Sequence, residues 1–329
     1  MSVLVLTEKE LQEIVGISDE AIEAVAKGFE LLSKNRVAMP PIMHIEIPEY
    51  EGDVDIKSAY VKGLERFAVK IGAGFFQNYK LGLPSSPAMM VVISAKTGMV
   101  EAIFLDNAYL TDVRTAAAGA VAADHLAPKV VDCAGVVGAG AQGRYQMLAL
   151  KQVRDFSRLM VYDLNDELVS EYVAQMSHEL GIEVMAANSV EELMAKSQCV
   201  VTCTPSKKAF IKKDYLHPGI HITAMGADLP EKQEICSDVF KTVDLIACDT
   251  RSQSFKQGEL FNAVTDGVKI NQTDVQELGE IISKQKPGRT SPGQITICDL
   301  SGTGVQDTMI ADLSLKKAME HKMGNQIKT

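Results

Sequence analysis

The stretch DCAGVVGAGAQGRYQM, residues 132–147, decides the fold of this 329-residue chain. A short apolar run leads directly into the pattern Gly-x-Gly-x-x-Gly at Gly138, Gly140 and Gly143, and a helical pattern follows. Strand, glycine loop and helix in this order open a βαβ unit. Each glycine then has its own reason: a tight turn at the first, close backbone approach to a ligand at the second, and close packing of helix on strand at the third.

The same loop predicts a dinucleotide site, because the first N–H groups and the dipole of the helix face a pyrophosphate. The next strand, RLMVYD, ends at Asp163, about 20 residues beyond the loop, where an acid binds the adenosine ribose diol. A carboxylate there disfavours a 2'-phosphate, so the sequence favours NAD over NADP, although Arg158 lies nearby. The alternative is a ligand-free glycine turn and a helix-capping aspartate. The candidate cofactor residues are Gly138, Ala139, Gly140, Ala141, Gln142, Gly143 and Asp163.

Strands and helices alternate from residue 130 onward. Apolar runs such as RLMVYD, IEVMA, QCVVTCT, HITAMG, VDLIACD and QITICDL are separated by amphipathic helical patterns. This alternation is typical of a parallel sheet that is covered on both faces. The sequence therefore predicts a Rossmann domain over residues 125–304, entered near Pro128.

The preceding part of the chain has a different texture. Thr7 and Glu10 have the spacing of a capping box, and helical periodicity follows in two short segments. Between residues 42 and 105 the runs become β-like, which predicts a mostly antiparallel sheet. The Ala-rich segment 111–127 and a last segment, 305–322, are helical. Because the last helix could pack back on the first domain, we expect a discontinuous, β-rich α+β domain of residues 1–124 plus 305–329.

Composition excludes several classes of partner. Asp and Glu number 43 against 33 Lys and Arg, and the net charge of -10 opposes approach to nucleic acid or anionic membranes. We find no apolar run of membrane-spanning length and no basic leader, which predicts a cytoplasmic protein. The six cysteines show no metal-ligand spacing, so we expect buried free thiols and no metal site.

Several motifs carry a family resemblance. They are MPP at Met39–Pro41, Lys70 in FAVKIG, Arg114 in TDVRTAAAGA, the glycine loop, GADLPEKQE at Gly226–Glu234 and DLSGTGVQD at Asp299–Asp307. With them the chain resembles the ornithine cyclodeaminase and mu-crystallin family over nearly its full length, and within it the ectoine-utilisation cyclodeaminase-like branch. The resemblance implies bound NAD, a small amino or imino acid substrate, and a homodimer formed through the substrate-binding domain.

The resemblance also implies roles for two cationic residues. Arg114 matches the arginine that clamps the substrate carboxylate, a task that suits a planar bidentate donor. Its alternative is a solvated arginine on a helix. Lys70 would lie in the active site beside the substrate Cα, and burial of a lysine is costly unless it meets an anion or a reacting group. From the residues alone, an edge-strand lysine is equally open.

Asp228 matches the aspartate that separates catalytic members from the mu-crystallin type. It follows the apolar strand HITAM, at the carboxyl end where parallel sheets bind ligands. A carboxylate there can stabilise an iminium and move its proton. The alternative is a loop aspartate before Pro230. By the same mapping, Thr204 and Met225 border the nicotinamide, and Thr115 reaches a phosphate.

One departure concerns the carboxylate site. Where relatives have a second arginine, this chain has His44, a weaker donor near neutral pH. The segment GLPS is a further part of the resemblance, which implies that Ser85 is also a substrate-binding residue. A lone histidine in a strand can equally be a surface residue. Three outcomes are open. Net imine reduction or amino acid oxidation and redox-neutral cyclodeamination share the implied hydride step, and the third outcome is ligand binding without catalysis. The looser grip at His44 favours imine reduction, and Asp228 argues against the third outcome.

Overall fold

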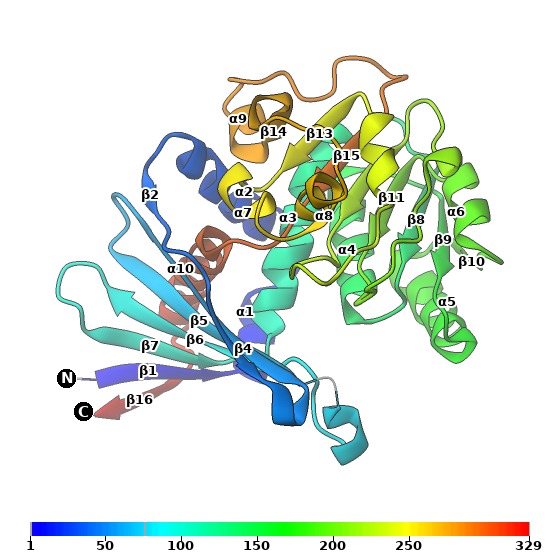
Figure 1. Cartoon of the computed structure of the whole chain (residues 1–329). Coiled ribbons are helices and arrows are strands. Elements are labelled where there is room, and N and C mark those ends of the chain that lie inside the picture. Colours follow the sequence, from blue (N-terminus) through cyan, green and yellow to red (C-terminus); the bar gives the residue numbers. More distant parts are fainter. Residues whose placement is uncertain (1, 76, 329) are drawn as a thin grey trace. The chain divides into compact units, whose positions relative to one another are not determined.

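The computed structural model describes residues 2–75 and 77–328, so the predicted domain limits at residues 1 and 329 lie outside it. The chain divides into two compact units (Figure 1). Unit 1 is Met1–Arg114 with Thr303–Thr329, and unit 2 is Thr115–Gly302. The division falls inside helix α3 (Tyr109–Leu126), and Arg114, the last residue of this part of unit 1, donates to Asp307 of the C-terminal helix.

Unit 1 is built on a mixed sheet with the order β16-β1-β7-β6-β5-β4-β2, in which β3 also pairs with β4. The antiparallel pairings over residues 42–105 confirm the predicted sheet, whereas β1 and β16 were not predicted. The strands are β1 (Ser2–Thr7), β2 (Val37–Ala38), β3 (Met43–Ile47), β4 (Gly52–Val61), β5 (Arg66–Phe75), β6 (Ala88–Ser94), β7 (Val100–Leu105) and β16 (Asn325–Lys328).

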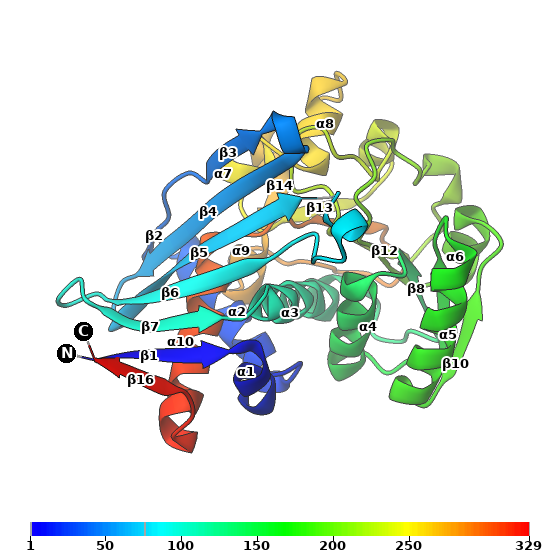
Figure 2. The ribbon, with the colours of Figure 1, turned by 90° about the horizontal axis from the view of Figure 1, so that it is seen from below.

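One face of this sheet is covered by helix α10 (Gly304–His321), which lies behind the strands in Figure 2. The Thr308 hydroxyl donates to the carbonyl of Ala59 at 2.7 Å and accepts from the N–H of Ala68 at 3.1 Å. Helix α10 begins against β4, and a Cβ at Gly304 would lie 2.5 Å from the Ser58 carbonyl. Unit 1 also contains α1 (Glu8–Ile14), which begins at the predicted Thr7/Glu10 capping box, and α2 (Asp19–Ser33).

Unit 2 is a doubly wound parallel sheet of order β10-β9-β8-β11-β12-β15-β13-β14. The first five strands have the order 3-2-1-4-5 of a Rossmann fold, which confirms the predicted class. The strands are β8 (Cys133–Val137), β9 (Arg158–Tyr162), β10 (Glu183–Ala186), β11 (Cys199–Thr202), β12 (His221–Ala224), β13 (Leu245–Cys248), β14 (Val275–Glu277) and β15 (Thr296–Asp299).

The helices of unit 2 cover the apolar strands on both faces. They are α4 (Ala141–Val153), α5 (Asp166–Leu180), α6 (Val190–Lys196), α7 (Arg251–Ser254), α8 (Glu259–Thr265) and α9 (Leu278–Ile282). Short 3-10 turns complete the chain at Pro48–Tyr50, Asn78–Leu81, Lys213–Tyr215, Ser237–Lys241 and Gln272–Asp274. The six cysteines are free, as expected, and four of them are buried. Within the described residues, none of the helices has both the length and the apolar character needed to cross a bilayer.

Candidate active site

The glycine loop of unit 2 has the geometry that its sequence predicts. Gly138 has a φ of +114°, which is a glycine conformation. A Cβ at Gly143 would lie 2.1 Å from the Gly138 carbonyl oxygen, so only glycine lets α4 pack this close. A Cβ at Gly140 would meet no atom within 4 Å, so the backbone at the start of α4 is open. Ala141 and Gln142 form the first helical turn, where N–H groups are available to an anion.

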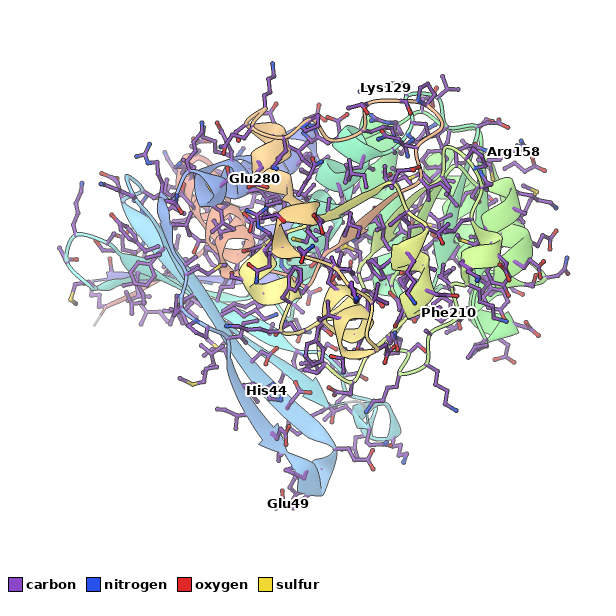
Figure 3. The ribbon with its side chains drawn as sticks, turned by 45° about the horizontal axis from the view of Figure 1, so that its top comes forward. His44, Glu49, Lys129, Arg158, Phe210 and Glu280 are labelled. Atoms are coloured by element: carbon purple, nitrogen blue, oxygen red, sulfur yellow. The ribbon has the colours of Figure 1, made fainter. Side chains whose placement is uncertain are left out.

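Asp163 lies beside this loop, just after β9. Its carboxylate accepts from the Ala139 N–H at 2.9 Å and from the Asn165 N–H at 3.0 Å, so Ala139 orients the acid. A cavity of about 550 Å³ adjoins it, lined by Val137, Tyr162, Asp163, Leu164, Val190, Thr204, Pro205, Ser206, Lys208, Ala209 and Phe210. Arg158, labelled in Figure 3, begins β9, at the other end of the strand from Asp163. Its guanidinium pairs with Asp132.

The residues expected to border the cofactor further along the sheet lie at neighbouring strand ends. Thr204 follows β11 and Met225 follows β12, and the Met225 N–H donates to the Thr202 carbonyl at 2.8 Å. Thr115, in α3, accepts at its carbonyl from the Gln146 amide at 3.0 Å and so joins the helix of the glycine loop. The structure therefore brings the predicted cofactor residues of unit 2 to the carboxyl end of its sheet, where such folds bind ligands.

Asp228 lies in the loop after β12. Its carboxylate pairs with Lys232 at 2.7 Å, and its carbonyl accepts from the Gln257 amide at 2.9 Å. The side chain is 41% exposed. A carboxylate that is exposed to this extent can also meet a cationic ligand group, which suits the expected role.

Unit 1 holds a buried cluster of charge. The Arg114 Nε donates to Asp307 at 2.9 Å and its Nη1 to the Gln306 amide oxygen at 3.0 Å, while Lys70 Nζ lies 3.5 Å from the other oxygen of Asp307. Lys70, Arg114 and Asp307 are 4%, 5% and 0% exposed. Among the described residues, no hydrogen bond occupies Arg114 Nη2. Asp307 and Gln306 thus hold the guanidinium through Nε and Nη1, and Nη2 is left to donate to a carboxylate.

The strand register explains how the sheet delivers further polar groups to this face. Lys57 of β4 is directly opposite Lys70 of β5, and Asp55, two residues earlier, is opposite His44 of β3. Cross-strand partners share a face, as do residues two apart. Asp55 accordingly lies 2.8 Å from the His44 Nδ1 and 3.9 Å from the Lys57 Nζ.

Burial and charge shift the pKa values of the unit 1 groups. Burial lowers the pKa of Lys70 to about 7, against the opposing effect of Asp307. The cations of Lys70 and Arg114 hold the pKa of Asp307 below its usual range although burial opposes them. The hydrogen bond to Asp55 raises the pKa of His44, and burial raises that of Asp106, which caps α3 at Leu110, to about 6. Lys70 is therefore poised to change charge near neutral pH.

Sequence reasoning missed Asp307, Gln306, Lys57 and Asp55. The motif DLSGTGVQD, which ends in the first two of them, contained the available signal. For Lys57 and Asp55 the signal was weaker. They lie two residues apart in β4, a strand that the sequence did not predict as a separate element. Ser85 lies in the loop between β5 and β6, where its carbonyl accepts from the Phe75 N–H at 2.8 Å. His44 is exposed on the β3–β4 hairpin (Figure 3), one row of residues from Lys57.

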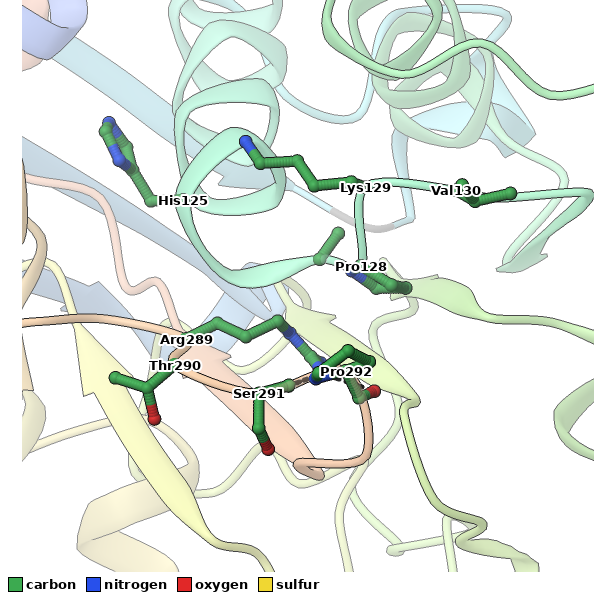
Figure 4. Close-up of a pocket in the computed structure, with 9 residues that line it drawn as sticks. His125, Pro128, Lys129, Val130, Arg289, Thr290, Ser291 and Pro292 are labelled. Carbon is green, nitrogen blue, oxygen red and sulfur yellow. Dashed lines mark hydrogen bonds between the residues drawn. The ribbon is translucent and has the colours of Figure 1, made fainter.

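A second cavity of unit 2, of about 400 Å³, contains His125, Lys129 and Arg289 (Figure 4). Arg289 has a structural role in this cavity. The guanidinium donates to the carbonyls of Leu126, Ile220, Ser291, Pro292 and Gln294 and to the Thr296 hydroxyl. It therefore supports the loop after residue 288 and has no donor left for an anion.

Comparison with known proteins shows the family to which the chain belongs. The model of the ornithine cyclodeaminase/mu-crystallin family matches residues 1–322. The chain belongs to this family.

Among its relatives, the chain is 42% identical to an uncharacterized cyclodeaminase from Sinorhizobium fredii (strain NBRC 101917 / NGR234), over 98% of this chain and 97% of the other. It is 34% identical to an alanine dehydrogenase from Archaeoglobus fulgidus, over 100% and 99%.

Two solved structures superpose on nearly the whole chain. An archaeal alanine dehydrogenase dimer with bound NAD is 33% identical, with a TM-score of 0.92 and coverage of 100% of this chain and 99% of that one. A Thermococcus litoralis Δ1-pyrroline-2-carboxylate reductase in complex with NADH and L-proline is 29% identical, with a TM-score of 0.93 and coverage of 99% and 100%.

Proposed function

We propose that this protein is an NAD(H)-dependent oxidoreductase that transfers hydride at the Cα of a small amino or imino acid. The observation that carries the proposal is the buried Arg114 of unit 1, fixed by Asp307 and Gln306 with an edge free for a carboxylate. Arg114 and Lys70 share the carboxylate of Asp307, so these three buried groups carry a net positive charge when Lys70 is protonated. A further carboxylate would balance that charge, and the carboxylate is the anionic group that amino and imino acids have in common. The proposal assigns substrate recognition to unit 1 and cofactor binding to unit 2.

The cofactor assignment rests on three features of unit 2. The glycine loop leaves its backbone open at Gly140, Asp163 borders a cavity of about 550 Å³, and Arg158 is paired away from that cavity. These residues fit NAD, with the pyrophosphate at the start of α4 and the ribose at Asp163. When bound, the nicotinamide supplies or accepts the hydride. Solved relatives that hold NAD or NADH support the assignment.

The chain's own groups then have separate tasks. Arg114 and protonated Lys70 hold the carboxylate and so fix the Cα in one orientation. Asp307 keeps Arg114 in place and favours the charged form of Lys70. Asp228 balances the positive charge of the iminium and can carry a proton to or from the nitrogen. His44 and Ser85 remain candidates for contact with the rest of the substrate.

A substrate panel tests the proposal. Cyclic and acyclic imino acids are mixed with NADH, and alanine, proline, ornithine and lysine with NAD, while absorbance at the NADH band is followed. We expect NADH oxidation with at least one imino acid whose nitrogen adjoins a carboxylate-bearing carbon. Failure of the whole panel, with NADH binding confirmed by calorimetry, would reduce the protein to a ligand-binding member of the family.

A redox-neutral cyclodeaminase is the second candidate, because the Sinorhizobium relative at 42% identity carries that name. Cyclisation requires the oxidised intermediate to remain bound while an internal amine reaches Cα. In this chain the Nδ1 of His44 is engaged with Asp55 at 2.8 Å, so His44 can offer a carboxylate only one ring N–H, whereas an arginine can offer two. Ammonia and proline formed from ornithine with no net change in NADH would establish the cyclodeaminase and displace the net redox reaction.

We also propose that unit 1 forms a homodimer through the face of its sheet that α10 does not cover. On β5 and β6 the side chains alternate between buried and partly exposed, and the partly exposed set is apolar. That set continues across the neighbouring strands and contains Ile56, Val69, Ile71, Met89, Val91, Ile93 and Ile103. An apolar face of this extent is typical of an interface. Light scattering should give about twice the 35.7 kDa chain mass, and Val91→Glu should give the monomer.

A further inference from the structure

The motif GADLPEKQE ends in Glu234, which the proposed reaction does not use. This residue is fully buried, yet its carboxylate makes four hydrogen bonds. One oxygen accepts from the N–H and hydroxyl of Thr204, both at 2.7 Å. The other accepts from the Thr202 hydroxyl at 2.7 Å and from the Gly226 N–H at 2.9 Å.

These four donors come from the carboxyl ends of two neighbouring parallel strands. Thr202 ends β11 and Thr204 follows it, while Gly226 follows β12. A single side chain therefore joins the two loops that carry Thr204, Met225 and Asp228. The approach is so close that a Cβ at Gly226 would lie 2.5 Å from the Glu234 carboxyl carbon and 2.2 Å from the Thr204 carbonyl oxygen.

Glu234 is itself held in place by a second buried carboxylate. The two oxygens of Glu259, in α8, accept from the N–H groups of Glu234 at 2.7 Å and Ile235 at 3.1 Å. The Glu234 carbonyl accepts from the N–H groups of Phe210 and Ile211 at 2.8 and 3.0 Å. Among the described residues, no lysine, arginine or histidine pairs with Glu234. Its hydrogen bonds to two strand ends are what balance its burial.

We infer that Glu234 is a positioning residue for the nicotinamide half of the cofactor site: it fixes the β11 and β12 loops relative to each other. This inference rests on the proposed NAD site. The adenosine half depends on other residues, the glycine loop and Asp163, although Thr204 also lines that cavity. The two halves can therefore be separated with ADP-ribose, which has the adenosine and pyrophosphate of NADH and lacks the nicotinamide.

The test compares the dissociation constants of NADH and ADP-ribose in Glu234→Gln. A glutamine has one acceptor oxygen, and we expect it to stay with the shorter contacts at Thr204, so that its NH2 faces the Gly226 N–H and releases the β12 loop. NADH should bind about 10-fold more weakly, the effect of one lost charge-assisted hydrogen bond, while ADP-ribose changes by less than about 3-fold. Gly226→Ala displaces the same loop from the other side and should give the same pattern.

Glu280→Gln is the matched control. Glu280 is a mostly buried carboxylate of α9 in the same unit (Figure 3), bound by Arg251 and the Glu277 N–H. Its loss should lower the melting temperature and leave both dissociation constants unchanged. Equal weakening of NADH and ADP-ribose in Glu234→Gln, or no weakening, overturns the inference. If the unmodified protein binds neither molecule, the proposed NAD site is wrong and the inference falls with it.

Discussion

The two sheets of this molecule present functional groups in different ways. In unit 2 the central strands β8, β11, β12 and β15 are buried along their whole length, and the polar groups stand just beyond the strand ends. In unit 1 the strands alternate between a covered and an uncovered face, and Lys57 and Lys70 stand in mid-strand on the covered face. A sheet that is covered on both faces leaves its ends for chemistry, whereas a sheet with two unlike faces can use its middle.

This difference separates two kinds of binding. The strand ends of unit 2 offer backbone N–H groups and short loops, which suit the phosphates and sugars of a cofactor. The mid-strand site of unit 1 offers buried cationic side chains fixed by α10, which suit a small carboxylate. Variants in unit 1 should therefore change the parameters of the substrate, and variants at the strand ends of unit 2 those of the cofactor.

The largest effect is expected from Arg114→Lys in unit 1. A lysine cannot hold Asp307 and Gln306 and still offer an edge to the substrate. With about two charge-assisted hydrogen bonds lost, kcat/KM should fall by about 10³ while the Kd of NADH stays within about 2-fold. Arg154→Lys is the control, since Arg154 is a buried arginine of unit 2 that bonds Asp124 and the Pro128 carbonyl. Loss of NADH binding in Arg114→Lys would contradict the assignment of substrate recognition to unit 1 and cofactor binding to unit 2.

Asp228→Asn probes the residue of unit 2 to which we assign chemistry. The amide keeps the shape and loses the charge that balances an iminium, so kcat should fall by about 10² with NADH binding nearly unchanged. Asp214→Asn, at another exposed aspartate of unit 2, is the control. Steady-state kinetics with a saturating imino acid provide the measurement. A normal kcat would assign the proton transfer and charge balance to another group.

The contrast between the sheets also explains what the sequence could predict. The glycine loop and Asp163 are close in sequence because one βαβ unit builds that site, so residue spacing alone indicated it. The cluster around Asp307 takes its members from β4, β5, α3 and α10, and no local pattern links such distant elements. Lys70 and Arg114 were found only through family motifs. Strands β1 and β16 were missed because their partners are distant in the sequence: β1 pairs with β16 on one side and with β7 on the other.

The pH dependence of kcat/KM tests the role of Lys70 in the mid-strand site of unit 1. Its pKa is lowered from 10.5 to about 7, so the free enzyme loses this cation as the pH rises above about 7. We expect kcat/KM to fall about 10-fold per pH unit above that point, and Lys70→Arg to move the fall beyond pH 10. The stability effect has the opposite sign: between pH 7 and 10.5 the unfolded state binds the extra proton, so this group makes the fold more stable as the pH rises.

A pH profile that is unchanged in Lys70→Arg would place the titration elsewhere, for example on the imine nitrogen of the substrate. Chemical denaturation of the apo protein at several pH values is the independent check. It reports the stability effect without any substrate, and the slope should be reduced in Lys70→Met.

The smallest effect is expected from Asp163→Ser in unit 2. The carboxylate repels a 2'-phosphate and accepts from the ribose, so the unmodified protein should bind NADH more tightly than NADPH. Serine removes the charge, and NADPH affinity should rise about 10-fold, the worth of about one pKa unit of interaction. NADH should bind somewhat more weakly, because serine replaces only in part the acceptor for the Ala139 and Asn165 N–H groups.

Asp166→Ser isolates the local effect of Asp163 from the change in net charge. Asp166 is exposed at the start of α5 and does not line the cavity, so its loss alters the total charge equally. We expect its NADH and NADPH affinities to match those of the unmodified protein. If both serine variants increase the affinity for NADPH equally, the choice of cofactor is set by the electrostatic field of the whole acidic protein. Lys208, which lines the same cavity, is then the group whose cation meets the phosphate.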